Sequence, residues 1–480
     1  MIVFFVVPAR AGSPGGFIEM PGTAIARPPL RRSQIQAFLP SRGGFSFPAP
    51  YNTRGVRITN ASDCGGADCV WNVGYSYWAN MNESAGSDIM YIFLGLDRSR
   101  GGGGPTLFSY NKVTDQVTNL GPLFDSSSAL SHNSGEGWYF SASQPTKLYF
   151  INNGTQMERY DVLTKQSQLV YDVTTQFGSG YGIWQMHSSN DDKVHGATLV
   201  HTSTRKFLGC VIFHEDSQRF QFFPQIRGFN ECSLDRSGRW AMSLEKYNRK
   251  YGLNMRVFDL SSGVNLLTSG VNPMSAGGLS SHAQMVAAGV ERDVLDQQGG
   301  VGHNDMGYGY TVGADNWSVA NAIRIWDFTK NPLSESTTGS LVFYDNSYAA
   351  PASDHISHLN ACPDLPINQQ FACGSSASTV VAPWSNEIVC YALDGSFRTL
   401  VVAPVMTEMS SSVGGGSYAE EPMGNIDFTG QYFIWTSNAG GTRMDAYLVK
   451  VPAQLIGGNT GTTPTGAVIR SDREQPHHGR

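Results

Sequence analysis

The sequence predicts an all-β protein, a seven-bladed β-propeller built as a single domain. An imperfect strand–turn–strand repeat recurs seven times along the chain, and repeats of this kind are typical of propeller blades. The 480 residues include 54 glycines, 11% aromatic residues and only 15% charged residues, which indicates many turns and strands. The long Ala-, Glu-, Lys- and Leu-rich stretches typical of helices are missing.

Each repeat consists of an apolar strand, a turn rich in Asp, Ser, Thr, Gly or Lys, and a second strand. One aromatic residue marks each copy, at intervals of 45 to 68 residues: Tyr110, Tyr160, Phe213, Phe258, Trp326, Tyr391 and Tyr447. We therefore expect seven four-stranded blades, with the longer intervals forming loop insertions on one face. The alternative, two stacked β-sandwiches, gives no reason for seven similar units.

A second hairpin signal lies between these repeats. Residues 234–242 and 426–435 each begin with an apolar residue followed by Asp, reach a Gly after two residues, and continue into an apolar run. This order predicts a tight hairpin that leads into a buried strand. Because the loops of a propeller gather on its faces, function is expected from strand ends and loops.

The two ends of the chain differ from the repeats in composition. Residues 1–11 form an apolar run ending in Ala9-Arg10-Ala11, which resembles the end of a signal peptide and predicts secretion. Residues 12–50 are rich in Pro, Gly and Arg and are interpreted as a linker, so that the domain spans 51–455. The tail 456–480 is expected to be disordered. No segment approaches the roughly 20 apolar residues of a membrane span.

The seven cysteines favour disulfides in a secreted protein. Cys64 and Cys69 flank a glycine-containing loop and should pair, and Cys210 with Cys232 is a second plausible pair. Two possibilities remain open for Cys362 and Cys373, a disulfide or a shared metal site. An odd number leaves at least one thiol free or intermolecular.

Net charge limits the class of partner. A formal charge of −6 argues against a nucleic-acid binder, although a locally basic cleft could still take an anionic substrate. No phosphate-binding loop, dinucleotide-binding fingerprint or Gly-x-Ser-x-Gly motif is present, and we expect no organic cofactor. A monomer without a membrane partner is expected.

Three histidine-rich clusters are the candidates for chemistry. The first holds His187 and His195 on either side of a Ser-Ser-Asn-Asp-Asp turn, with His214 on the next strand. The second, residues 300–310, surrounds His303, Asp305, Tyr308 and Tyr310 with glycines, which let the backbone approach a ligand. For an isolated histidine or tyrosine in a β protein, an ordinary core or surface role competes with each of these interpretations.

The third cluster suggests a metal. Two histidines and two cysteines lie within 20 residues in 354–373, a ligand set that suits zinc although the spacing matches no zinc finger. With a histidine from the preceding cluster, the candidate ligands of a structural zinc or calcium ion are His303, His358, Cys362 and Cys373. The alternative is a Cys362–Cys373 disulfide beside ordinary histidines.

Several stretches resemble the ulvan lyases of polysaccharide lyase family 24. They are 56–64, 74–78, 135–142, 184–192, 302–310 and 432–438, and the similarity runs from about residue 50 to 455. The resemblance implies a seven-bladed propeller, a structural metal, and β-elimination at a uronic acid of a polymer that contains rhamnose 3-sulfate. It also implies catalytic histidine, tyrosine and arginine residues, at positions that match His195, His214, Tyr308 and Arg324.

The chemistry of elimination explains that set. The C5 proton of a uronate becomes acidic only when its carboxylate is neutralised, and arginine grips a carboxylate with two hydrogen bonds. We expect Arg324 in that role, His195 as base or carboxylate contact, His214 as a second contact and Tyr308 as the acid. Further substrate contacts are expected from His187, Tyr310, and a basic loop with Lys246 and Arg249 that could bind sulfate.

Two other functions compete with an ulvan lyase. One is a non-catalytic propeller that binds a glycan or a protein. The other is a lyase for a different uronate polymer such as oligogalacturonate, in which a metal would take part in catalysis. A pair of catalytic carboxylates, typical of glycoside hydrolases, is not recognisable in the sequence.

Overall fold

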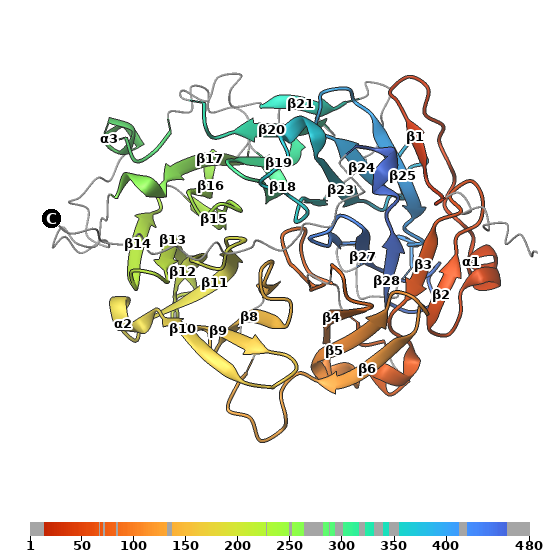
Figure 1. Cartoon of the computed structure of the whole chain (residues 1–480), viewed down its shortest axis with the longest axis horizontal. Helices are drawn as coiled ribbons and strands as arrows, with labels where there is room; N and C mark the ends of the chain where they lie inside the picture. Colours follow the sequence, from red (N-terminus) through yellow and green to blue (C-terminus); the bar gives the residue numbers. More distant parts are fainter. Residues whose placement is uncertain are drawn as a thin grey trace, which may run out of the picture.

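The computed structural model describes residues 14–66, 68–70, 73–82, 85–131, 137–226, 228–248, 252–263, 282–287, 289–292, 301–315, 322–330, 339–344, 355–411 and 420–457. These residues form seven antiparallel sheets arranged in a ring around a central axis (Figure 1). The architecture is therefore the predicted seven-bladed propeller.

Within each blade the strands follow one another from the axis to the rim. The first three blades contain β4 (Ile89–Leu96), β5 (Gly104–Asn111) and β6 (Val117–Pro122); β7 (Trp138–Phe140), β8 (Lys147–Asn152), β9 (Gln156–Asp161) and β10 (Ser167–Asp172); and β11 (Tyr181–Ser188), β12 (Val194–His201), β13 (Lys206–His214) and β14 (Arg219–Pro224). In the first blade the innermost position is reduced to a bridge between Met81 and Ile92 of β4.

The remaining blades complete the ring. Blades four and five contain β15 (Gly228–Leu234), β16 (Trp240–Asn248) and β17 (Gly252–Asp259), and β18 (Val301–Met306), β19 (Tyr310–Asp315), β20 (Ala322–Asp327) and β21 (Ser340–Phe343). Blades six and seven contain β22 (His355–Ser357), β23 (Phe371–Ser375), β24 (Glu387–Ala392) and β25 (Thr399–Pro404), and β26 (Asn425–Ile426), β27 (Tyr432–Ser437) and β28 (Asp445–Lys450).

The repeat found in the sequence corresponds to the third strand from the axis. All seven aromatic markers lie there, on β5, β9, β13, β17, β20, β24 and β28. An Asn or Asp often follows the marker and caps the turn to the next strand. Asp161 Oδ1, for example, accepts hydrogen bonds from the backbone N–H groups of Leu163 and Thr164, at 2.9 and 3.0 Å. A side chain that binds its own turn explains why this motif recurs.

The second hairpin signal is also confirmed. Asp235 Oδ1 accepts a 2.8 Å hydrogen bond from the backbone N–H of Trp240, which closes the β15–β16 turn. Asp427 does the same for Tyr432 between β26 and β27, also at 2.8 Å. Each turn thus joins the innermost strand of its blade to the second strand.

The N-terminal segment does not form the expected linker. β3 (Arg54–Arg57) pairs with β28 and β2 (Gly43–Ser46) pairs with β3, so both extend the seventh blade. β1 (Phe17–Glu19) pairs with β25 at the rim of the sixth blade. The prediction of a linker is therefore wrong for residues 17–46, while residues 1–13 and 458–480 lie outside the described residues.

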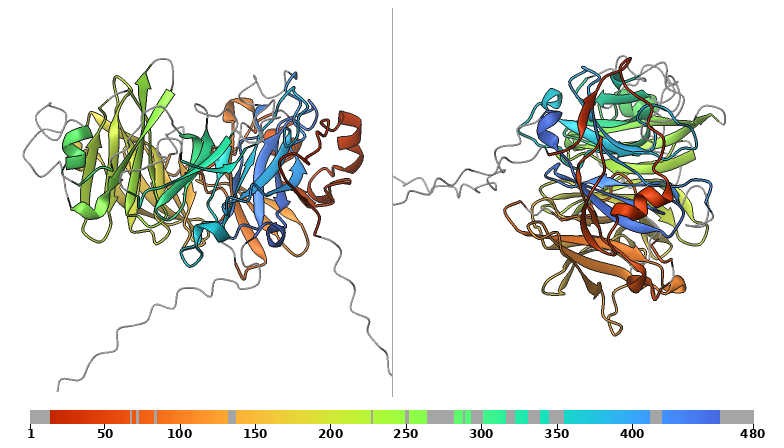
Figure 2. Two further views of the ribbon diagram at one scale, coloured as in Figure 1. Left: turned by 90° about the horizontal axis from the view of Figure 1, so that it is seen from above. Right: turned by 90° about the vertical axis from the view of Figure 1, so that its right-hand side faces the viewer.

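Short helices and 3-10 turns lie outside the sheets. They are α1 (Arg32–Phe38), α2 (Thr174–Phe177), α3 (His282–Ala287), and the 3-10 turns η1 (Ala61–Cys64), η2 (Arg98–Arg100), η3 (Leu260–Ser262), η4 (Ile367–Gln369) and η5 (Ala453–Leu455). Figure 2 shows α1 and α3 at opposite edges of the ring. No helix in the described part of the chain is long and apolar enough to span a membrane.

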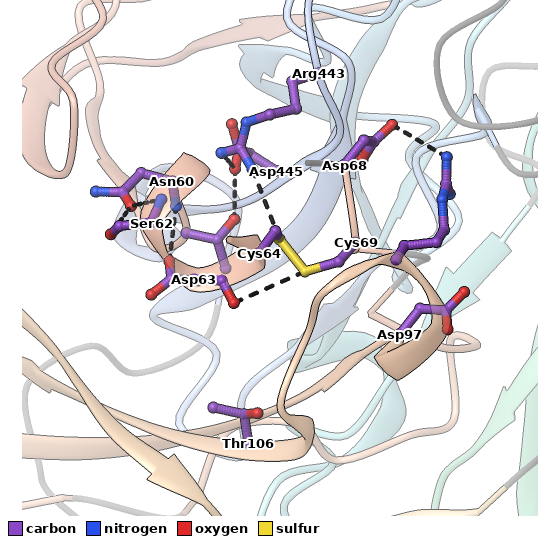
Figure 3. Close-up of a disulfide and its surroundings, with 12 residues drawn as sticks. Asn60, Ser62, Asp63, Cys64, Asp68, Cys69, Asp97, Thr106, Arg443 and Asp445 are labelled. Carbon is purple, nitrogen blue, oxygen red and sulfur yellow. Dashed lines mark hydrogen bonds and ion pairs between the residues drawn. A yellow bond between two sulfur atoms is a disulfide. The ribbon is translucent and has the colours of Figure 1, made fainter. Parts of the chain in front are cut away.

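Three disulfides bind neighbouring strands and turns. The predicted Cys64–Cys69 and Cys210–Cys232 pairs are both present. The first closes the turn after β3, where Arg443 Nη1 lies 3.8 Å from Cys64 Sγ (Figure 3). Cys373 pairs with Cys390 on the adjacent strand and not with Cys362, which is the free and half-buried thiol.

Candidate active site

Polar side chains from several blades meet around the axis of the ring. They come from the innermost strands, from the hairpins that follow these strands, and from the segment 73–78 that precedes the first blade. In Figure 1, β11, β15 and β18 lie on the axis side of their blades. We call this group of side chains the axis site.

Arg236 occupies the centre of the axis site and is completely buried. Its Nε donates to the carbonyl oxygen of Met306 at 3.0 Å, and its terminal nitrogens donate to Tyr139 Oη and to Asp305. Burial works against the charge of Arg236, but the neighbouring carboxylate of Asp305 outweighs it, so the pKa is raised and the guanidinium stays charged. Asp305 also accepts the backbone N–H of His358 at 2.7 Å.

His358 and Tyr310 form a closed pair beside this arginine. Because the carbonyl of Phe371 can only accept, His358 Nδ1 donates to it at 3.0 Å, which leaves Nε2 to accept from the Tyr310 hydroxyl at 2.6 Å. Burial and the charge of Arg236 lower the pKa of His358 to about 3. A Cβ atom on Gly307 would lie 2.0 Å from the Tyr310 ring, so only glycine lets the hairpin fold over this ring.

Tyr308 lies in the same hairpin and is half-buried. Asn190 Nδ2 donates to its hydroxyl oxygen at 2.9 Å. Burial raises the pKa of Tyr308 to about 12, although Asn190 and Arg236 favour the phenolate. Tyr308 therefore carries its proton at neutral pH and can donate it.

A ladder of rings connects the blades on the axis. The centroid distances are 4.1 Å for His355–His303, 5.5 Å for His303–Tyr75, 5.9 Å for Tyr75–Tyr77 and 4.6 Å for Tyr77–His187. These rings come from blades five and six, the segment before the first blade, and blade three. The Glu421 carboxylate lies 3.7 Å from His355 Nε2, and burial raises its pKa despite the opposing effect of His303.

Two imidazoles of this ladder are neutral and keep open nitrogens. Burial lowers the pKa of His355 to about 4, and burial together with Arg236 lowers that of His187 to about 3. His187 Nδ1 and both nitrogens of His355 are buried without a hydrogen-bond partner among the described residues, as is the indole nitrogen Nε1 of Trp78. Buried polar atoms are usually satisfied, so open atoms gathered near one axis point to a ligand.

The axis site unites five of the twelve predicted residues: His187, His303, His358, Tyr308 and Tyr310. His195 is fully buried elsewhere in the third blade, where Nδ1 contacts Ser188 Oγ and Nε2 contacts Glu215 Oε1, each at 2.8 Å. Burial tends to raise the pKa of Glu215, but the interactions of its carboxylate with His195 and Arg159 outweigh burial, so the pKa is lowered. Both ring nitrogens of His195 are thus occupied.

His214 and Arg324 do not join His195. In the register of the sheet His195 faces Phe213 while His214 faces Val194, so the two histidines point to opposite faces of the blade. Arg324 is buried on the third strand of blade five, where Nε donates to Asp315 at 2.6 Å and Nη1 to the Gly339 carbonyl at 3.0 Å. Contrary to the expectation from the sequence, His195, His214 and Arg324 therefore do not surround one uronate.

The predicted metal ligands do not form a metal site. The sulfur of Cys373 is bonded to Cys390, and both ring nitrogens of His358 are occupied. Across the described residues, no group of three or more His, Cys, Asp or Glu side chains is arranged to hold a metal ion. The rings of His303 and His355 stack at 16° and so do not converge on one point. The expected zinc or calcium set therefore does not fit.

The predicted basic loop lies at the edge of the described residues. Arg249 lies outside the described residues, and only the backbone of Lys246, on β16, is described. Sequence reasoning also missed several members of the axis site, namely Tyr75, Tyr77, Tyr139 and Arg236. Tyr75 and Tyr77 belong to the stretch 74–78, one of those that resemble the family 24 lyases. The signal available in the sequence was the close spacing of these two tyrosines and Trp78.

Comparison with known proteins supports the fold. No family model and no curated protein sequence matches this chain. The crystal structure of an oligogalacturonate lyase from Vibrio parahaemolyticus superposes with a TM-score of 0.53 at 10% identity, over 86% of this chain and 97% of that one. An oligogalacturonate lyase in complex with manganese gives 0.52 at 10% identity, over 92% and 100%. At this identity the likeness concerns the propeller fold.

Proposed function

We propose that the protein is a polysaccharide lyase that cleaves a uronate-containing polymer by β-elimination at the axis site. The observation that carries this proposal is that a neutral imidazole with an open nitrogen, His187, and a protonated tyrosine, Tyr308, both feel the charge of one buried cation. Asn190, in the turn that follows the strand of His187, donates a hydrogen bond to Tyr308. Elimination needs just such a base and acid, because one proton leaves C5 and another reaches the departing oxygen. The fold shared with two oligogalacturonate lyases is in keeping with it.

In this mechanism His187 Nδ1 takes the C5 proton of the uronate. Its electron pair forms the C4–C5 double bond, the bond from C4 to the linking oxygen breaks, and Tyr308 protonates that oxygen. Tyr77 stacks on His187 and holds the ring in place. The positive charge that makes the C5 proton more acidic comes from the field of Arg236, the buried cation of the axis site. No step is routed through a metal, since the predicted ligand set does not fit one.

The identity of the polymer that is cleaved is the more specific part of the proposal. The fold likeness favours a galacturonate polymer, whereas the motifs 184–192 and 302–310 favour ulvan through their resemblance to family 24 lyases. The three disulfides support the proposal that the protein is secreted, because disulfides persist in oxidising compartments.

The test is the absorbance at 235 nm, where the unsaturated uronate product absorbs. Purified protein is incubated with oligogalacturonate, polygalacturonate, ulvan and alginate, with and without a chelator followed by added manganese. A rise on one polymer establishes elimination and identifies the substrate. No rise on any of them, from folded protein with metal supplied, would overturn the proposal and favour a glycan- or protein-binding propeller.

A further inference from the structure

Asn190, in the turn between β11 and β12, contacts the tyrosine that the proposed chemistry uses as its acid. Its Nδ2 donates to the Tyr308 hydroxyl oxygen at 2.9 Å, which is the single hydrogen bond of this side chain within the part of the chain that the structure describes. The other end of the amide, Oδ1, is buried without a hydrogen-bond partner among the same residues. A buried amide that served only the fold would be expected to use both ends. The side chain of Asn190 is therefore directed at Tyr308.

The backbone around Asn190 is held from two neighbouring blades. Its own N–H donates to the Arg236 carbonyl of blade four at 2.9 Å. Two residues further on, Asp192 Oδ2 accepts hydrogen bonds from the hydroxyls of Ser141 and Ser143 in blade two, each at 2.5 Å. A turn that is anchored on both sides holds the amide in place before a substrate arrives, so no reorganisation is needed during the reaction.

The backbone around Tyr308 is held by the same part of blade four. The Gly307 carbonyl accepts from the Arg236 N–H, and the Gly309 N–H donates to Asp235 Oδ2, both at 2.9 Å. Both partners belong to the β15–β16 turn, which also anchors the amide. One turn thus sets the relative positions of the amide and the phenol, although the two come from blades three and five.

The direction of the hydrogen bond determines what the phenol can do. Because the Tyr308 oxygen accepts from Asn190 Nδ2, the hydroxyl hydrogen has to point away from the amide. None of the described residues accepts this hydrogen, so it stays available for a substrate oxygen. A hydroxyl that accepts one hydrogen bond also donates more strongly, because its O–H bond is polarised. Burial raises the pKa of Tyr308 to about 12, and the bond from Asn190 opposes burial.

We propose that Asn190 is a positioning residue that aims the Tyr308 hydroxyl hydrogen at the leaving oxygen and stabilises the phenolate that remains after transfer. Its catalytic consequence rests on the proposed function. In this step the O–H bond of Tyr308 breaks, its proton bonds to the oxygen that leaves C4, and the electron pair stays on the phenolate. Nδ2 then donates to a charged oxygen, which strengthens the bond. A proton from water afterwards restores the phenol.

The first experiment measures the contact between Asn190 and Tyr308 without substrate. A ring-fluorinated tyrosine is introduced at position 308, because its more acidic hydroxyl titrates while the protein is still folded, and fluorine NMR follows its signal against pH. In Asn190→Ala the midpoint should rise by about one pH unit, since the phenolate loses a hydrogen-bond donor. In Asn190→Asp it should rise further, because a carboxylate of the same shape only accepts and repels the phenolate.

Asp191, the next residue in the chain, supplies the matched control. It is exposed, and its carboxylate accepts from Ser189 Oγ at 2.6 Å within the same turn. Asp191→Ala should leave the midpoint unchanged. Asn190→Ser, which suits a turn but falls short of Tyr308, replaces Asn190→Ala if the latter does not fold. An unchanged midpoint in the folded variant overturns the inference. So does a lower midpoint, which would mean that Tyr308 donates to the amide.

Turnover then separates this inference from the proposed function. If the absorbance assay shows elimination, Asn190→Ala should lower kcat roughly 10²-fold while KM changes little, as for the loss of one preorganised donor. Asn190→Asp should be no better, whereas an amide with a purely structural role could be replaced by Asp with little loss. If no polymer is cleaved while the midpoint still shifts, only the lyase proposal fails. If elimination occurs and Asn190→Asp keeps the kcat of the wild type, only the role of Asn190 fails.

Discussion

The open nitrogen of His187 is the atom on which the proposed chemistry depends. His187→Gln removes the base but keeps a polar side chain of similar size, so we expect kcat/KM to fall by roughly 10²–10⁴-fold. Tyr308→Phe should also reduce kcat, because the leaving oxygen loses its proton donor. Both are measured as initial rates at 235 nm on the polymer that the wild type cleaves.

His201→Gln and Tyr181→Phe are the matched controls for these variants. Both residues lie at the far end of the same β11–β12 pair, where Tyr181 faces His201. They should keep wild-type turnover. His195→Gln tests the base role predicted from the sequence: retained turnover per folded molecule would show that its hydrogen bonds to Ser188 and Glu215 serve the fold alone.

Buried neutral histidines should make the fold sensitive to acid. His187, His355 and His358 have pKa values lowered to about 3, 4 and 3, with burial as the largest cause. In the unfolded chain each binds a proton below about pH 6.5. Between that pH and about 4 the unfolded state binds more protons, so the free energy of unfolding falls as the pH falls.

His355→Gln tests this relation. Each histidine contributes roughly 1.4 kcal/mol per pH unit, so the variant should show a shallower dependence by about that amount. The measurement is urea unfolding at several pH values between 6.5 and 4.5. His201→Gln serves as the control, and an unchanged slope in His355→Gln would contradict the prediction.

Elements with a strong local pattern were predictable, and elements that depend on distant partners were not. The third strand of each blade was found because of its apolar run and its aromatic marker, and in several blades the run ends in a self-capping turn, as at Asp161. The innermost strands β22 and β26 have three and two residues, too few to show a period. β2 and β3 were missed because β3 pairs with β28 at the other end of the chain.

The same reasoning explains the partial success at the axis site. His187, His303 and Tyr308 stood out because polar residues and glycines cluster around them in the sequence. Arg236 and Tyr139 gave no such signal, since the contact between them joins residues 97 positions apart. The error at Cys373 has the same origin: its partner Cys390 lies directly across the β23–β24 pair, in a register that the spacing did not reveal.

The Cys210–Cys232 bridge gives a prediction at the level of elements. It joins β13 of blade three to β15 of blade four and closes a loop with a sequence separation of 22. Replacing both cysteines by alanine should lower the free energy of unfolding by about 3 kcal/mol. Denaturant unfolding measures this, and Cys362→Ala, which removes the free thiol, is the control with an expected change below about 1 kcal/mol.

The pairing of β3 with β28 closes the ring. Asp445 accepts from Arg57 at 2.5 Å and from Thr59 at 2.7 Å, and the Ile58 N–H donates to the Ala446 carbonyl at 2.9 Å. These contacts join the end of β3, and the two residues that follow it, to the start of β28. Without β3, the edge of β28 would be exposed, and open strand edges promote aggregation.

Two truncations test this closure. Removal of residues up to 40 deletes β1 and α1 but keeps β2 and β3, and should yield a folded monomer with a lower Tm. Removal up to 58 also deletes β2 and β3, and should yield aggregated or unfolded protein. Circular dichroism and size-exclusion chromatography distinguish the two results, and a stable monomer from the longer deletion would show that the ring does not depend on β3.

The pairing of β3 with β28 has a consequence for how the chain folds during synthesis. Arg57 and Asp445 are separated by 388 residues, so the strand made early must wait for the strand made last. At roughly 5–20 residues per second, translation of the intervening chain takes on the order of 20–80 s. Throughout this interval β3 has no partner strand on the β28 side, and the ring stays open. The nascent chain therefore exposes these unpaired strand edges for longer than a protein whose blades each close on their own.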